Sequence, residues 1–256
     1  LYLKGTLTEL SSYIWMPLIL LFIKKSFETQ NGWIILAVLY AALILSTVPL
    51  ALVLSPLFIF YIGFLIFLKT KEEKKWEASF LLPYASLVMG FCLAGYYIVT
   101  AYLMTDYIRV EEFWSANYNP RNWFFCLTEC QTGTNGFLQR KFTDLFSAQI
   151  LIILALFIYL GKYHKEKFEH YIFWSVMALG AYFMMSEYSI FFWDHIPLLE
   201  RIQFPFRIAV TLDIILVFAL AQTQIFKTIK MQKAEIFTLI CIMLFFTFSL
   251  RTYYGF

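Results

Sequence analysis

The residues best suited to chemistry gather in one stretch, residues 189–207, which reads SIFFWDHIPLLERIQFPFR and continues directly into the apolar segment 208–221. Arg207 stands at this boundary, Gln203 lies one helical turn before it, and Asp213 lies about 9 Å beyond it if the segment is helical. A guanidinium can hold phosphate oxygens through two parallel hydrogen bonds. A carboxylate in an apolar segment is costly unless it is paired or faces water. Both side chains are therefore candidates for a site at a membrane boundary.

Each candidate also has a purely structural interpretation. Arg207 could extend to lipid head groups from the start of a membrane span. Asp213 could accept a hydrogen bond from Thr or Tyr on a neighbouring span. Glu9, before the first span, could face the same cavity as Arg207 or complement a helix dipole. Glu187 is interpreted as a solvated helix end.

The elements that must position these residues are membrane spans. The chain has 256 residues, of which 61% are hydrophobic and 14% are charged, against about a quarter charged in soluble proteins. This composition predicts an all-α, polytopic integral membrane protein, multi-pass in a cell membrane. The net charge of +3 is too small to indicate a nucleic-acid partner.

A span needs roughly 17–25 apolar residues, and this rule predicts about eight of them. The uncharged run from residue 33 to 68 is too long for one span and is divided into two, with a break near residues 46–49. The other spans are expected near residues 7–23, 80–103, 145–161, 170–186, 207–226 and 235–250. Together they form a single transmembrane domain over residues 1–256.

The lysine clusters favour an even number of spans. With eight spans, four lysine-bearing connections lie on one face, which the positive-inside rule assigns to the cytoplasm. Their members are Lys24, Lys25, Lys69, Lys71, Lys74, Lys75, Lys162, Lys165, Lys167, Lys227, Lys230 and Lys233. The other face then carries every Arg of the chain, the segment 187–206 and an extracytoplasmic loop at residues 104–142.

The loop at 104–142 holds two of the four cysteines, Cys126 and Cys130. An oxidising compartment would permit a disulfide between them, and two free thiols are the alternative. A C-x3-C pair without a second ligand pair does not indicate zinc. We expect no metal site and no cofactor, although a divalent cation would be compatible with the chemistry below.

The segment 189–207 resembles bacterial membrane proteins of the "6-pyruvoyl-tetrahydropterin synthase-related" family, which are similar to the C-type (GT-C) glycosyltransferase superfamily. Their run reads Ser, Trp four on, Pro four on, Leu-Leu, then Ile-Gln-Phe-Pro-Trp-Arg. The matching residues here are Ser189, Trp193, Pro197, Leu198, Leu199, Ile202, Gln203, Phe204, Pro205 and Arg207, and Phe206 replaces Trp. Residues 1–20 are similar to the family's Tyr-x-Arg-Gly-x-x-x-Glu opening, with Gly5 and Glu9 kept and Lys4 in place of Arg. Residues 43–52 and 94–113 resemble two further family segments more loosely.

The resemblance implies transfer of a sugar from a polyprenyl-phosphate donor at the outer membrane face. Arg207, Gln203, Asp213 and Glu9 become candidate contacts for the phosphate or head group. GT-C proteins usually carry their catalytic carboxylate in a first extracytoplasmic loop, which would precede Leu1, so the chain is expected to be the C-terminal part of a longer protein. No catalytic residue is assigned.

Other functions stay open beside glycosyl transfer. One is a non-catalytic membrane assembly protein, and another is a transporter or flippase of a lipid-linked glycan. Pterin synthase chemistry is excluded, because it needs three zinc-binding histidines. His164, His170 and His195 would lie on both sides of the membrane in the predicted topology. Membrane lipid is the expected partner, and the sequence does not indicate an oligomeric state.

Overall fold

The computed structural model describes residues 2–29, 32–104, 121, 123–127, 134–196, 199, 202 and 204–222. Within these ranges, side chains are described except at residues 2–12, 134–138 and 222. The described chain is helical, and its one β feature is an isolated parallel bridge between Phe125 and Ser186. The chain divides into two compact units, Leu1–Asn119 and Pro120–Phe256.

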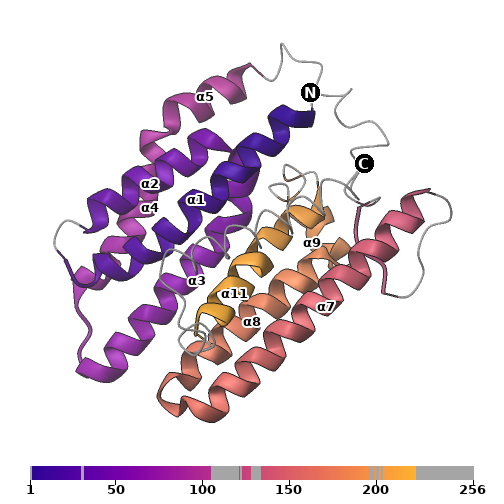
Figure 1. Ribbon diagram of the computed structural model, residues 1–256. Coiled ribbons are helices and arrows are strands. Elements are labelled where there is room, and N and C mark those ends of the chain that lie inside the picture. Colours follow the sequence, from indigo (N-terminus) through magenta and orange to yellow (C-terminus); the bar gives the residue numbers. More distant parts are fainter. Residues whose placement is uncertain are drawn as a thin grey trace, which may run out of the picture. The chain divides into compact units, whose positions relative to one another are not determined.

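The described part of the first unit is a bundle of helices (Figure 1). They are α1 (Tyr2–Ser26), α2 (Gly32–Ser46), α3 (Val48–Glu73), and the pair α4 (Leu82–Leu93) and α5 (Gly95–Leu103), which follows the 3₁₀ turn η1 (Ala78–Leu81). Helix α2 packs against both α1 and α4. The unit's core consists of aliphatic and aromatic side chains, including Met16, Ile19, Ile23, Leu36, Leu43, Leu54, Leu57, Phe58 and Ile62.

The predicted break between α2 and α3 is confirmed. Helix α2 ends at Ser46, Thr47 is extended with φ −162° and ψ 103°, and α3 begins at Val48 with Pro49 in its first turn. Proline is tolerated there because the first turn has no intrahelical acceptor for its missing N–H. In one continuous helix, Pro49 would remove a hydrogen bond and clash with the preceding turn.

The segment predicted as one span at residues 80–103 is bent. Helices α4 and α5 meet at an angle of 49° around Ala94. Gly95 follows the break, and glycine is a common residue at helix kinks. A hydropathy window does not detect such a bend, because both halves are apolar.

In the described part of the second unit, three long helices pack on one another: α7 (Thr134–Tyr163), α8 (Phe168–Met185) and α11 (Ala209–Gln222) (Figure 1). Short elements join them: η5 (Lys165–Lys167), η6 (Glu187–Ser189), α9 (Ile190–His195) and η7 (Pro205–Ile208). Helix α7 begins at Thr134, so its first two turns lie inside the stretch predicted as a loop at 104–142. Those turns are amphipathic, with Gln139 and Phe142 buried and Arg140 and Lys141 exposed.

By length and composition, two of the described helical segments could each cross a membrane, Val48–Glu73 and Gln139–Tyr163. The bent pair Ala78–Leu93 and Gly95–Leu103 would be a third if it acts as one span. The all-α prediction is therefore confirmed for the described residues, and membrane localisation is compatible with them. The predicted span at 235–250 lies outside the described residues.

In the first unit, two basic connections lie at the same end. The Lys69 Nζ near the end of α3 donates a hydrogen bond to the Phe27 carbonyl just after α1, at 3.0 Å. Phe27 and Phe80 also pack, with ring centroids 6.3 Å apart. In the second unit, Lys162, Lys165 and Lys167 occupy the turn between α7 and α8.

Candidate functional site

The candidate residues of the second unit lie at the end opposite its lysine-bearing turn. Here the C-terminus of α8, the short helix α9 and the start of α11 come together (Figure 1). A segment that we call the strap, described at Arg121 and at residues 123–127, packs on them. This end therefore combines the 189–207 stretch with part of the predicted 104–142 loop.

The strap pairs with the chain just after α8 through backbone hydrogen bonds. The Phe125 N–H donates to the Met185 carbonyl at 3.2 Å, and the Glu187 N–H donates to the Phe125 carbonyl at 3.3 Å. The Leu127 N–H donates to Glu187 Oε1, also at 3.2 Å. Glu187 thus has a structural role in holding the strap, in addition to being the predicted helix end.

The strap is also tied to α7. The Thr143 hydroxyl lies 3.0 Å from the Cys126 carbonyl and 2.8 Å from the Gln139 carbonyl, so it can donate to either. Cys126 is buried and disulfide-bonded. The predicted partner, Cys130, lies outside the described residues.

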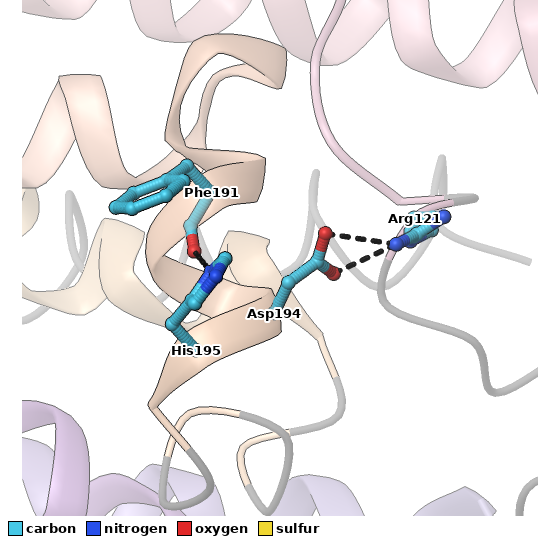
Figure 2. Close-up of polar contacts among 4 residues, drawn as sticks. All are labelled: Arg121, Phe191, Asp194 and His195. Atoms are coloured by element: carbon cyan, nitrogen blue, oxygen red, sulfur yellow. Dashed lines mark hydrogen bonds and ion pairs between the residues drawn. The ribbon is translucent and has the colours of Figure 1, made fainter.

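An ion pair joins the strap to α9. A single guanidinium nitrogen of Arg121 lies 2.9 Å from Oδ1 and 2.8 Å from Oδ2 of Asp194 (Figure 2). The pair is largely exposed, so its free energy is small, about 0–1 kcal/mol. On the same helix, His195 Nδ1 lies 2.8 Å from the Phe191 carbonyl, which can only accept, so Nδ1 is the donor (Figure 2).

Trp193 and Ser189, which both belong to the stretch 189–207, stabilise this end of the second unit. The Trp193 Nε1–H donates to the Met184 carbonyl at 3.1 Å. The Ser189 hydroxyl lies 2.9 Å from the same carbonyl and 2.8 Å from the Ser186 carbonyl, so it can donate to either. Both side chains are buried. They satisfy a carbonyl in the last turn of α8, where no intrahelical donor is available. Their spacing therefore has a structural explanation that does not require a substrate.

Aromatic rings fill the space between the strap and the start of α11. The Trp123 ring lies 5.6 Å from Phe204 and 6.0 Å from Phe206, both nearly edge-on. Phe142 of α7 stacks on Phe206 at 5.6 Å, and Phe124 meets Trp193 at 5.4 Å. Such pairs add about 0.5–1.5 kcal/mol each beyond the area they bury.

Arg207 lies on this aromatic group, half-buried in η7. Its guanidinium donates a hydrogen bond to the Ile202 carbonyl at 2.7 Å and lies 5.0 Å from the centroid of the Phe204 ring. These contacts fix the cation at the start of α11 rather than leaving it on a mobile side chain. A fixed, partly exposed guanidinium in this position can recognise a phosphate or carboxylate.

Asp213 has a different environment, since it is buried inside the helix bundle. Its Oδ1 accepts a hydrogen bond at 2.9 Å from the side-chain amide of Gln149, which is also buried. The structural interpretation, an interhelical hydrogen bond, is thus observed, with Gln149 as a donor. Nothing in the spacing of the sequence distinguishes Gln149, which lies 64 residues away on α7.

The remaining predicted site residues are not described in side-chain detail. Gln203 lies outside the described residues, and Glu9 belongs to α1 in the first unit, where its side chain is not described. Among the described residues searched, no group of three or more His, Cys, Asp or Glu side chains could hold a metal ion. In comparisons with known proteins, no family model, no curated protein and no solved structure matches this chain.

Proposed function

We propose that the chain is part of a GT-C-like membrane protein that binds a polyprenyl-phosphate-linked sugar at the extracytoplasmic face. The observation that carries this proposal is the environment of Arg207. The Ile202 carbonyl and the Phe204 ring hold its half-buried guanidinium at the end of the unit opposite the lysine-bearing turn. A preorganised cation of this kind stabilises the charge of a leaving phosphate without reorganising during the reaction.

The topology we propose has eight spans and a multi-pass arrangement in a cell membrane. Two features of the second unit support an extracytoplasmic position for the candidate site. The short turn between α7 and α8, with Lys162, Lys165 and Lys167, is a basic connection of the kind that the positive-inside rule assigns to the cytoplasm, and the candidate site lies at the other end of the unit. Cys126 is disulfide-bonded, and disulfides persist in oxidising compartments.

Within this proposal, the candidate residues have different roles. Arg207 contacts the phosphate, and Gln203 contributes to head-group binding. Asp213 fixes α11 against α7 through Gln149, and so positions Arg207 indirectly. The general base is a carboxylate that this chain does not identify.

The test is replacement of Arg207 in cells that make the protein. We expect Arg207→Ala to lower the yield of glycosylated surface product at least ten-fold at normal protein level, and Arg207→Lys to restore part of it. Lysine keeps the charge but loses the planar, two-bond geometry. Arg140→Ala, which removes an exposed arginine from the same end, is the matched control. Undiminished product in Arg207→Ala would reject the proposal.

A second candidate is a non-catalytic assembly protein. It is favoured by the internal partners of both charged candidates, Ile202 for Arg207 and Gln149 for Asp213. In that case Arg207→Ala would lower product only in proportion to the loss of folded protein. Measuring product and folded protein in the same cells separates the two functions.

A further inference from the structure

The first unit brings lysines from two separate connections to one end. The contact between Lys69 Nζ and the Phe27 carbonyl places the end of α1, with Lys24 and Lys25, beside the end of α3, with Lys71. The chain then leaves α3 through Lys74 and Lys75. Six lysines therefore lie at this end, and they come from parts of the sequence about 45 residues apart.

Lys69 itself has a structural role. Its ammonium lies 5.6 Å from the centroid of the Phe27 ring and 5.7 Å from that of Phe80, and it is 4.0 Å from a carboxylate oxygen of Glu73. This half-buried cation joins α1, α3 and η1. Lys69 therefore lies where the packed part of α3 ends, and the residues of α3 from Lys71 onward are exposed.

If α3 spans the membrane, the lysines beyond Lys69 lie within reach of the lipid head groups. The uncharged part of α3, residues 48–68, is about 31 Å long at about 1.5 Å per residue, which matches a hydrocarbon core of about 30 Å. The head-group layer adds roughly 5–7 Å on each side. If α3 spans the membrane, Lys71 lies about 4.5 Å beyond the core and within that layer. Lys74 and Lys75, both exposed, lie about 9 Å or more beyond the core, just outside the layer, which their long side chains can reach.

The backbone and an aromatic side chain also suit an interfacial position. Lys74 ends α3 in the left-handed conformation, with φ 52°, so the chain turns away from the helix axis there. Trp76 follows with 59% of its surface exposed, and Trp favours the membrane–water interface. Four glutamates, Glu28, Glu72, Glu73 and Glu77, reduce the positive charge of this end but do not cancel it.

From this arrangement we propose that the lysine-rich end of the first unit, centred on Lys71, Lys74 and Lys75, binds the head groups of anionic phospholipids. Basic residues next to a membrane span attract anionic lipid, and the attraction is screened by salt. The inference rests on membrane insertion of α3 and does not depend on glycosyl transfer. Arg207→Ala is expected to leave this lipid preference unchanged.

The test uses the full chain reconstituted in phosphatidylcholine bilayers with spin-labelled phosphatidylglycerol or spin-labelled phosphatidylcholine as the probe. We expect the motionally restricted lipid to show a several-fold preference for phosphatidylglycerol at low salt, which 0.5 M salt, where the screening length is on the order of a few Å, largely removes. K71Q/K74Q/K75Q should reduce the preference at least three-fold, and K71R/K74R/K75R should keep it.

The matched control is K162Q/K165Q/K167Q, which removes the same charge from the lysine-bearing turn of the second unit. Equal association of the two lipids with the unchanged chain would overturn the proposal, as would a preference that only the control variant loses. Displacement of the lipid by millimolar glycerol phosphate would instead indicate a site for free phosphate. If the triple variant fails to fold, K74Q/K75Q gives the same readout without altering the body of α3.

Discussion

The carboxylate of Asp213 is accommodated in an apolar helix by an amide from another helix. Burying an unpaired carboxylate costs several kcal/mol, and hydrogen bonding to the charged or the neutral form reduces that cost. Gln149 supplies an N–H donor at 2.9 Å. The contact therefore fixes the rotation of α11 relative to α7, because both side chains must face each other.

Removing the Gln149 amide should show how much the stability of the fold depends on its hydrogen bond to Asp213. We expect Gln149→Leu to lower the free energy of unfolding by about 1–3 kcal/mol, since a buried acceptor loses a donor. The double variant Gln149→Leu/Asp213→Leu should lose less than the sum of the single variants. Unfolding in mixed detergent measures both, and Ala148→Leu, at the exposed neighbouring position, is the control. Additive losses would mean that the two residues do not stabilise each other.

Trp193 allows a second prediction about a single residue. Trp193→Phe keeps an aromatic ring against Phe124 but removes the Nε1–H that reaches the Met184 carbonyl at 3.1 Å. We expect a loss of about 1–2 kcal/mol in unfolding free energy. Trp76→Phe, at a side chain that is 59% exposed, should change little. Equal effects at the two positions would show that the hydrogen bond to Met184 contributes nothing.

The sequence predicted a candidate residue where its type was unusual for the surrounding segment. It did not predict which residues the candidates contact, because one of these contacts lies in a distant segment and both are ordinary residue types. Arg207 and Asp213 are charged groups at or inside an apolar run, so their positions alone identified them as candidates. Their partners, Ile202 and Gln149, are ordinary residues that only the packing distinguishes. The role of Trp193 as an anchor for the end of α8 also depends on a backbone carbonyl that the sequence does not mark.

At the scale of elements, the contact between α2 and α4 depends on a glycine. A Cβ built on Gly90 would lie 2.6 Å from the Ala37 carbonyl oxygen and 3.0 Å from a ring carbon of Tyr40. Two helices approach this closely only where one of them has no side chain.

Gly90→Ala should therefore separate α2 from α4. Because the obstacle is a backbone oxygen rather than a flexible side chain, we expect a cost of about 1–3 kcal/mol in unfolding free energy. A Cβ added at Gly95 has no atom of another described helix within 4 Å, so Gly95→Ala is the matched control. Alanine favours helix over glycine by up to about 1 kcal/mol, so this control should be neutral or stabilising. A stable Gly90→Ala variant would show that the two helices can move apart without loss.

Elements were predictable to the extent that hydropathy and proline define them. The break at Thr47 followed from the length of the apolar run and from Pro49. The early start of α7 was missed because its first turns are amphipathic and polar residues dominate them. The pairing of the strap with Ser186 was missed because a single backbone bridge has no pattern in the sequence.

At the scale of the whole molecule, most of the described charged residues of each unit lie near the ends of its helices. In the first unit, the contact between Lys69 and Phe27 confirms that two of the predicted lysine connections share one end. In the second unit, the described lysines of the turn between α7 and α8 lie away from Arg207 and from the disulfide-bonded Cys126. The predicted topology adds that the lysine-rich ends of both units face the same compartment.

Labelling of single cysteines tests this topology directly. Thr70→Cys reports on the end of α3 and Lys165→Cys on the turn between α7 and α8, and both should be protected from an impermeant thiol reagent added outside intact cells. Arg140→Cys, at an exposed position in the first turns of α7, should react with that reagent. Cys92 and Cys241, which lie in apolar runs, are replaced by Ser or Ala in each variant, and Cys126 and Cys130 are kept so that the disulfide still forms. Residues 70 and 165 are expected to be protected because the positive-inside rule assigns the short lysine-bearing connections to the cytoplasm. If the cysteines at 70 and 165 label from opposite sides, the number of spans between them is odd. If the cysteine at 165 is the one that labels from outside, the arginine-bearing end of the second unit cannot face the compartment that the proposed function requires.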